Sequence, residues 1–141
     1  MGECGVYRGE VGIETRERFE VIDVTGLVEG VVRSSGITEG LVNVFVPHTT
    51  AGIIVNEAER GLMEDFLDYI RGLTRPGGGW RHNRIDDNAH AHLGQATFGG
   101  SLTIPLGGGR LLLGTWQRLL FVEMDGPRKR RLVVTVVGTR G

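Results

Sequence analysis

The sequence predicts an α+β fold in which antiparallel, sandwich-like sheets pack against two or three helices. Four strand-like segments near the C-terminus are separated by turns of only a few residues, and such short connections require antiparallel neighbours. A segment in the middle of the chain repeats apolar residues every three or four positions, which is the period of an amphipathic helix. The 141 residues contain no internal repeat and no linker. We therefore expect one domain over residues 1–141.

The first elements follow from two different hydrophobic patterns. Apolar and polar residues alternate over 11–15 and 19–24, which predicts two strands of a hairpin. Thr25 then begins a helix that runs to about Ser35, with Thr25 as its capping residue. Gly36 is expected to end this helix, because glycine favours the backbone conformation found just after a helix.

The next segments alternate between strand and helix. Strands are expected at 41–46, where a proline follows, and at 51–55. The clearest helix runs over 58–73, since its apolar residues form one continuous stripe. Asn56, with Glu59 three residues later, is a variant of the capping box and predicts the start of this helix.

The second half begins with a glycine-rich loop at 75–81 and ends in strands. A short helix is expected over 88–98, capped by Asp87 or Asn88. Glycine-rich or proline-containing turns separate the remaining apolar segments. These predict four strands, at 101–106, 110–113, 116–124 and 131–137.

Composition excludes several classes of protein. A formal net charge of -1 argues against a general nucleic-acid or membrane-surface binder, which would need a wide basic field. Cys4 is the only cysteine, so no disulfide forms within the chain. No signal peptide or membrane-spanning segment is recognisable, and we expect a cytoplasmic protein. Lys129 is the only lysine among 16 basic residues, and the arginines favour bidentate recognition of phosphate or carboxylate.

Three of the four histidines, His82, His90 and His92, fall within eleven residues, and His48 follows a predicted strand. Imidazole is the commonest metal ligand, and a catalytic zinc site typically uses three protein ligands with one position open. His48, His82 and one of the other two would supply that number. Residues two apart do not share a helix face, so His90 and His92 cannot both contribute if 88–98 is helical. The alternative is a set of hydrogen-bonded loop histidines.

Two carboxylates are candidates for proton transfer. Glu57 follows a strand near His48 in the sequence, and it could orient an imidazole or act as a general base. The alternative for Glu57 is a role in starting the following helix. Asp87 lies inside the histidine segment and is the second candidate. We assign both residues to the predicted catalytic group.

A phosphate site is predicted from the basic turn at 127–131. Its guanidinium groups, Arg128 and Arg130 in particular, have the chemistry of a phosphate or pyrophosphate clamp. The alternative is a charged hairpin end that prevents strand edges from pairing with other chains. Hydroxyls of Thr49 and Thr50 beside His48, and the amide of Gln117, are further candidate ligand contacts.

The order and spacing of several motifs resemble the YjbQ family, whose members are commonly named secondary thiamine-phosphate synthase enzymes. The resemblance covers about 11–138, and its most specific part is the Gly-Thr-Trp-Gln element. It is based on these segments of the chain: Pro47-His48-Thr49-Thr50-Ala51, Asn56-Glu57, Asn88-Ala89-His90-Ala91-His92-Leu93, Gly99-Gly100-Ser101-Leu102, Gly114-Thr115-Trp116-Gln117 and Asp125-Gly126-Pro127-Arg128.

The resemblance implies a homotrimeric α+β sandwich with sites near subunit contacts. It maps the metal ligands onto His48, His82 and His92 and leaves out His90, which we expect to be a surface residue. It implies a metal-dependent transferase that joins a pyrimidine diphosphate to a thiazole phosphate, giving thiamine phosphate and pyrophosphate. Zinc suits three imidazoles and a water, and magnesium is an alternative that would enter with the substrate. The chain would then have small phosphorylated metabolites as partners.

Two other functions fit the same residues. One is a metal-dependent hydrolase or lyase acting on another small phosphorylated or carboxylated metabolite, with a metal-bound hydroxide as nucleophile. The other is a non-enzymatic trimer that binds a metal or a ligand. The sequence identifies neither the physiological substrate nor the metal.

Overall fold

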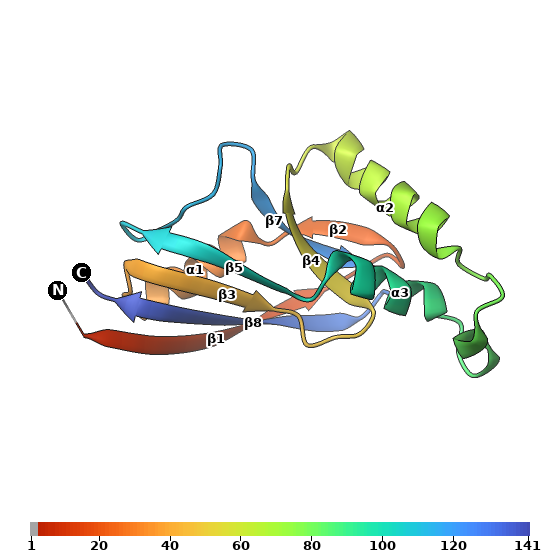
Figure 1. Ribbon diagram of the computed structural model, residues 1–141, viewed down its shortest axis with the longest axis horizontal. Helices are drawn as coiled ribbons and strands as arrows, with labels where there is room; N and C mark the ends of the chain where they lie inside the picture. The colour runs from red at the N-terminus through yellow and green to blue at the C-terminus, as the bar shows by residue number, and fades with distance from the viewer. Residues whose placement is uncertain (1–2) are drawn as a thin grey trace.

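The computed structural model describes residues 3–141 as two antiparallel sheets packed face to face, with helices at the sides (Figure 1). The larger sheet has the strand order β1-β8-β3-β5-β6, and the smaller has the order β2-β7-β4. The strands are β1 (Cys4–Glu14), β2 (Glu20–Asp23), β3 (Glu39–Phe45), β4 (Ala51–Asn56), β5 (Ser101–Gly107), β6 (Arg110–Leu111), β7 (Arg118–Glu123) and β8 (Lys129–Thr139). The helices are α1 (Thr25–Ser35), α2 (Arg60–Thr74), the 3₁₀ turn η1 (Arg81–Arg84) and α3 (Ala89–Phe98). The predicted α+β class is therefore confirmed.

The main hydrophobic core fills the space between the two sheets. Alternate residues of β3 and β8 point inward, as the period of two in a strand requires. Val28 and Val32 of α1 join them from one side. Burial of these aliphatic side chains is the main contribution to the stability of the sandwich.

A second, smaller core holds α2 and α3 against the other face of the three-stranded sheet. It contains Leu67 and Ile70 from α2, and Val122 and Met124 from β7 and the turn after it. Strand β7 is thus buried on both faces, which explains its nearly continuous apolar sequence. The close packing of α3 also depends on Gly94, because a Cβ atom there would lie 2.3 Å from the sulfur of Met124. These contacts fix α3 beside the end of β7, where the pocket described below opens.

The helices lie close to their predicted positions, but the capping residues differ. Thr25 does not cap α1, since its hydroxyl accepts a hydrogen bond from the backbone N–H of Leu119. The N-cap of α2 is Glu59, whose carboxylate accepts from the N–H groups of Gly61 and Leu62. Asn56 instead accepts from the N–H of Glu57, so the predicted capping box is wrong.

The predicted N-terminal hairpin is also wrong. Strand β1 pairs with β8 and strand β2 pairs with β7, so the two belong to different sheets. The chain likewise changes sheet between β6 and β7 and again between β7 and β8. Short connections therefore carry the chain from one sheet to the other, as well as forming the β5–β6 hairpin.

The outer face of the five-stranded sheet has no helix over it in the described part of the chain. Leu41 of β3 lies beside Val137 of β8 and Pro105 of β5, and Val137 also pairs with Val6 of β1. Val6, Leu41 and Val137 are exposed. Together with Pro105, which is also exposed, they form an apolar row across four strands. Within residues 3–141, no helix has the length and apolar character needed to cross a membrane.

Candidate functional site

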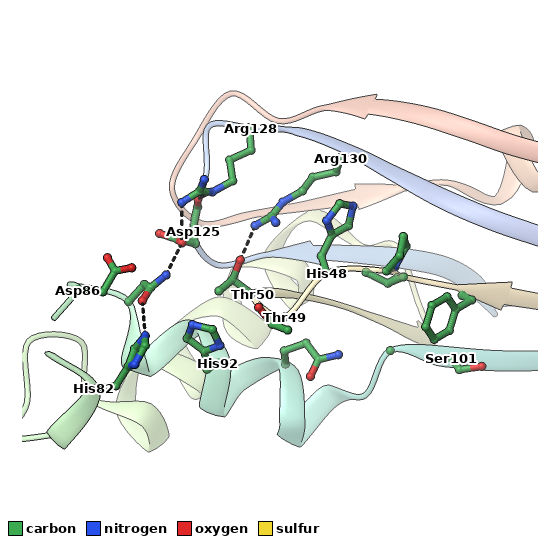
Figure 2. A pocket seen from close by; sticks show the side chains of 16 residues that line it. His48, Thr49, Thr50, His82, Asp86, His92, Ser101, Asp125, Arg128 and Arg130 are labelled. Carbon is green, nitrogen blue, oxygen red and sulfur yellow. Dashed lines mark hydrogen bonds and ion pairs between the residues drawn. The ribbon is translucent and has the colours of Figure 1, made fainter.

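A pocket of about 910 Å³ opens where β3, the turn after β7 and the N-terminal half of α3 meet (Figure 2). Histidine, arginine and acidic side chains share this pocket. Its lining consists of Phe45, Val46, Pro47, His48, Thr49, Thr50, His82, Asp86, Asn88, His92, Gln95, Gly100, Ser101, Asp125, Arg128 and Arg130.

His48 is held on one wall of the pocket by a backbone hydrogen bond. Pro47 follows strand β3, and the chain then turns so that the Nε2 atom of His48 accepts from the N–H of Arg131 at 3.0 Å. Partial burial lowers the pKa of His48, and the positive charge of Arg130 lowers it further. At neutral pH this imidazole is therefore neutral, with its proton on Nδ1.

Arg130 is anchored below the pocket by a buried ion pair. Its Nε donates to Oε1 of Glu123 at 2.8 Å, and its Nη2 contacts Oε2 of Glu123 and the hydroxyl of Thr50. Thr15 donates a further hydrogen bond to Glu123. The guanidinium is thus fixed in orientation, and in the described chain its Nη1 atom has no protein acceptor.

A chain of side-chain contacts connects the basic turn to the histidine segment. Nη2 of Arg128 donates to Oδ2 of Asp125 at 2.9 Å, and Nδ2 of Asn88 donates to the same oxygen at 2.9 Å. Oδ1 of Asn88 lies 3.1 Å from Nε2 of His82. Figure 2 shows these contacts running from Arg128 across to His82.

His82 and His92 lie next to each other, with ring centroids 4.7 Å apart in a T-shaped arrangement. His48 lies on the other side of the pocket, beside Arg130 (Figure 2). Among residues 3–141, no three His, Cys, Asp or Glu side chains lie close enough to share a metal ion. The predicted ligand set therefore enters one pocket but does not assemble into a three-ligand centre within the single chain.

Several predicted contacts meet in the pocket and three do not. Thr49, Thr50, Arg128 and Arg130 line it as expected. Glu57 does not, because it follows the far end of β4, about 20 Å along a six-residue strand from the pocket.

The other two misplaced residues are engaged elsewhere. Asp87 points to solvent and forms an exposed ion pair with Arg18 at 3.6 Å. Gln117 lies in the exposed connection between β6 and β7, where its side-chain oxygen accepts from the N–H of Gly114. Within one chain, Asp87 and Gln117 are outside the pocket.

His90 is buried on the opposite face of α3 from His92. Its Nε2 atom donates to the carbonyl of Met124 at 3.1 Å, and its ring packs against Phe19 with centroids 5.4 Å apart. Its Nδ1 atom has no hydrogen-bond partner in the described chain. Burial lowers the pKa of His90. The helical argument that separates His90 from His92 is therefore correct, but the expected surface position is wrong, since His90 is 1% exposed and belongs to the core.

Sequence reasoning missed several polar pocket residues, among them Asp86, Asn88 and Asp125. Asn88 was assigned to helix capping, yet no cap hydrogen bond from its side chain is present. Asp125 lies between the strand predicted at 116–124 and the basic turn at 127–131. The available signal was its position between a buried strand and the basic turn, which is where a carboxylate can organise arginines.

Together the sandwich and the pocket define a class of small α+β proteins with an arginine- and histidine-lined cavity at one end of two packed sheets. The chain belongs to the YjbQ-like UPF0047 protein family, whose model matches residues 9–139. The family predicted from the sequence motifs is thus confirmed.

Similar proteins occur in archaea and bacteria. A UPF0047 protein of Archaeoglobus fulgidus is 48% identical over 125 residues, covering 89% of this chain and 97% of the relative. The UPF0047 protein YugU of Bacillus subtilis is 38% identical over 130 residues, covering 89% and 96% of the two chains.

Two solved structures have the same fold. A YbjQ-like protein of unknown function from Sulfolobus solfataricus P2 is 46% identical, with a TM-score of 0.94 over 96% of this chain and 99% of that one. A hypothetical protein from Aeropyrum pernix K1 is 55% identical, with a TM-score of 0.92 over 94% and 98% of the two chains.

Proposed function

We propose that the pocket binds small phosphorylated metabolites and catalyses a transfer in which a pyrophosphate group leaves one of them. The observation that carries this proposal is the presence of Arg128, Arg130 and three histidines around one cavity. Guanidinium groups bind phosphate oxygens in a bidentate manner, and imidazoles exchange protons near neutral pH.

The arginines have different parts in this proposal. Arg130 is fixed by Glu123 and Thr50, so it would present a preorganised donor to an incoming phosphate without losing side-chain freedom. Arg128 is half exposed and is tied to Asp125 through two atoms. It would contact the outer phosphate oxygens. Thr49 and Thr50 would add hydroxyl contacts beside them.

The specific reaction we propose is thiamine-phosphate synthesis. A pyrimidine diphosphate loses pyrophosphate as its methylene carbon bonds to the ring nitrogen of a thiazole phosphate. Negative charge develops on the leaving pyrophosphate, and the two guanidinium groups would stabilise it. His92 or His82 would protonate or orient the departing oxygens. The cavity of about 910 Å³ is large enough for two small substrates.

We propose that a divalent metal ion also binds in the pocket. Zinc is the first candidate, and magnesium that enters with the substrate is the alternative. His82 and His92 are adjacent enough to serve as two ligands, and a bound cation would further neutralise pyrophosphate. Since a three-ligand group is not formed among residues 3–141, we assign no step to the metal.

We also propose that the chain acts as a homotrimer. The apolar row formed by Val6, Leu41, Val137 and Pro105 has no cover in residues 3–141, and a second copy would remove it from water. Phe45 lies on the same sheet face and also lines the pocket, so such an interface would approach the site.

The direct test is to incubate the purified protein, with and without zinc or magnesium, with both phosphorylated substrates and to measure thiamine phosphate. The proposal predicts product in the wild type and a strong loss in Arg130→Ala and His92→Ala. Absence of product under every metal condition would contradict the synthase. Hydrolysis of either substrate alone would favour the hydrolase, because the pocket is open to water.

A further inference from the structure

Asn88 lies between the carboxylate of Asp125 and the imidazole of His82 and contacts both. The residue is 6% exposed, and both ends of its amide are engaged. Nδ2 lies 2.9 Å from Oδ2 of Asp125, and Oδ1 lies 3.1 Å from Nε2 of His82. Neither interaction belongs to the helix that begins at the next residue, so they are not part of ordinary helix capping.

The orientation of this amide is determined by Asp125. The carboxylate of Asp125 accepts a hydrogen bond from Nη2 of Arg128 at 2.9 Å and lies 3.9 Å from Nη2 of Arg18. An ionised carboxylate only accepts hydrogen bonds. The NH₂ group of Asn88 must therefore face Asp125, and its carbonyl oxygen must face His82.

The carbonyl oxygen of Asn88 in turn determines the protonation of His82. An amide oxygen only accepts, so Nε2 of His82 must carry a hydrogen. In a neutral imidazole with a hydrogen on Nε2, the lone pair resides on Nδ1. Asp125 thus determines the orientation of the Asn88 amide, and that amide determines which ring nitrogen of His82 carries the hydrogen.

We propose that Asn88 is a positioning residue that, oriented by Asp125, holds His82 as the Nε2–H tautomer and leaves the lone pair on Nδ1. The ring orientation is supported from a second side by His92, whose ring meets it edge to face. The tautomer follows from the contacts alone, whereas its use in catalysis rests on the proposed function. In that function Nδ1 of His82 is the ring nitrogen left free to contact the substrate.

The proposal identifies a role for Asp125 as well. Asp125 does not touch His82 and acts through Asn88, so it is a positioning residue too. Replacing it with asparagine keeps the volume but supplies both a donor and an acceptor. The amide of Asn88 is then free to turn over, and its NH₂ group can face His82.

The test is nuclear magnetic resonance of the full-length protein labelled with ¹⁵N in histidine, without substrate and at about pH 8, above the ordinary imidazole pKa of about 6.5. Long-range ¹H–¹⁵N correlations report which ring nitrogen carries the hydrogen. His82→Gln assigns the signals. The variants are Asn88→Ala and Asp125→Asn, and Asn56→Ala is the control because Asn56 is exposed and far along β4.

The wild type and Asn56→Ala are expected to show a pure Nε2–H pattern for His82, with a ring N–H protected from solvent exchange. Asn88→Ala is expected to lose that protection, and Asp125→Asn to show both tautomers. An Nδ1–H tautomer in the wild type would overturn the proposal, as would an unchanged His82 pattern in both variants. Because no substrate is present, a positive result combined with no turnover would contradict the proposed function and leave this inference intact.

Discussion

Glu123 and Arg130 form a two-point ion pair at the base of the pocket, with the side chains 0% and 5% exposed. A buried charge is costly when it lacks a partner, so this pair ties the stability of the sandwich to the chemistry of the site. Thr15 and Thr50 satisfy further hydrogen bonds of the two groups. The guanidinium that we assign to phosphate binding is therefore also a structural element.

Removing the charge of Arg130 is expected to destabilise the fold strongly. Arg130→Met leaves the Glu123 carboxylate buried without its partner, and we expect a loss of about 3–5 kcal/mol in the free energy of unfolding. Urea unfolding followed by circular dichroism measures it. Arg131→Met, which breaks only the exposed pair with Glu10, is the control and should cost less than about 1 kcal/mol. An equal loss in the free energy of unfolding in both variants would show that the buried ion pair contributes no more to stability than the exposed pair.

The buried imidazole of His90 is expected to make stability depend on pH. Burial lowers the pKa of His90 in the folded state, so below about pH 6.5 the unfolded chain binds a proton that the folded chain excludes. Stability is therefore fully present above that pH and falls as the pH drops towards the lowered pKa. The pKa of His48 is also lowered and acts in the same direction.

Chemical unfolding at a series of pH values between about 5 and 8 isolates this contribution. His90→Gln keeps a donor for the carbonyl of Met124 but cannot titrate. We expect its stability to fall less steeply with acid than that of the wild type. Identical slopes for the two proteins would contradict the assignment to His90.

The apolar row on the uncovered sheet predicts which substitution would break the proposed trimer. Leu41→Glu places a charge in the centre of the row, beside Val137 and Pro105, and we expect the variant to become monomeric because burying that carboxylate is unfavourable. Multi-angle light scattering measures the mass. Tyr69→Glu is the control, since Tyr69 is also an exposed apolar residue, 68% exposed against 52% for Leu41, but lies on α2. A monomeric wild type at micromolar concentration would refute the trimer itself.

Elemental analysis tests the predicted metal ligands one by one. If His48, His82 and His92 hold one zinc ion, each change to alanine should abolish about one equivalent of bound metal. The adjacency of His82 and His92 predicts that these two variants lose the metal first. Retention of metal in His48→Ala alone would restrict the ligands to the adjacent pair. Metal-free wild type after growth with added zinc would exclude this site.

The sequence was sufficient for the helices and for most strands, because each has a local hydrophobic period. It was insufficient for strand pairing: β1 and β2 are neighbours in sequence but belong to different sheets, and only long-range packing decides this. In the same way His48, Arg128 and Arg130 were recognisable by residue type, and the fold brings them together.

The misassigned site residues have a common physical reason. Glu57 was placed near His48 from sequence proximity, but an extended strand carries the chain quickly away from the pocket. Asn88 and Asp125 were overlooked because their types are usual at caps and turns. Their roles follow from contacts between segments 37 residues apart, which no local pattern reveals.

The central claim is that the arginines of this pocket bind phosphate groups, and calorimetric titration with pyrophosphate tests it most directly. We expect saturable binding to the wild type and a loss of affinity of about tenfold or more in Arg128→Ala, since a charge-assisted hydrogen bond contributes about 1.5–3 kcal/mol. Arg131→Ala, in the same basic segment but outside the pocket lining, should bind as the wild type does. Equal weakening in both variants, or no binding to the wild type, would contradict the account.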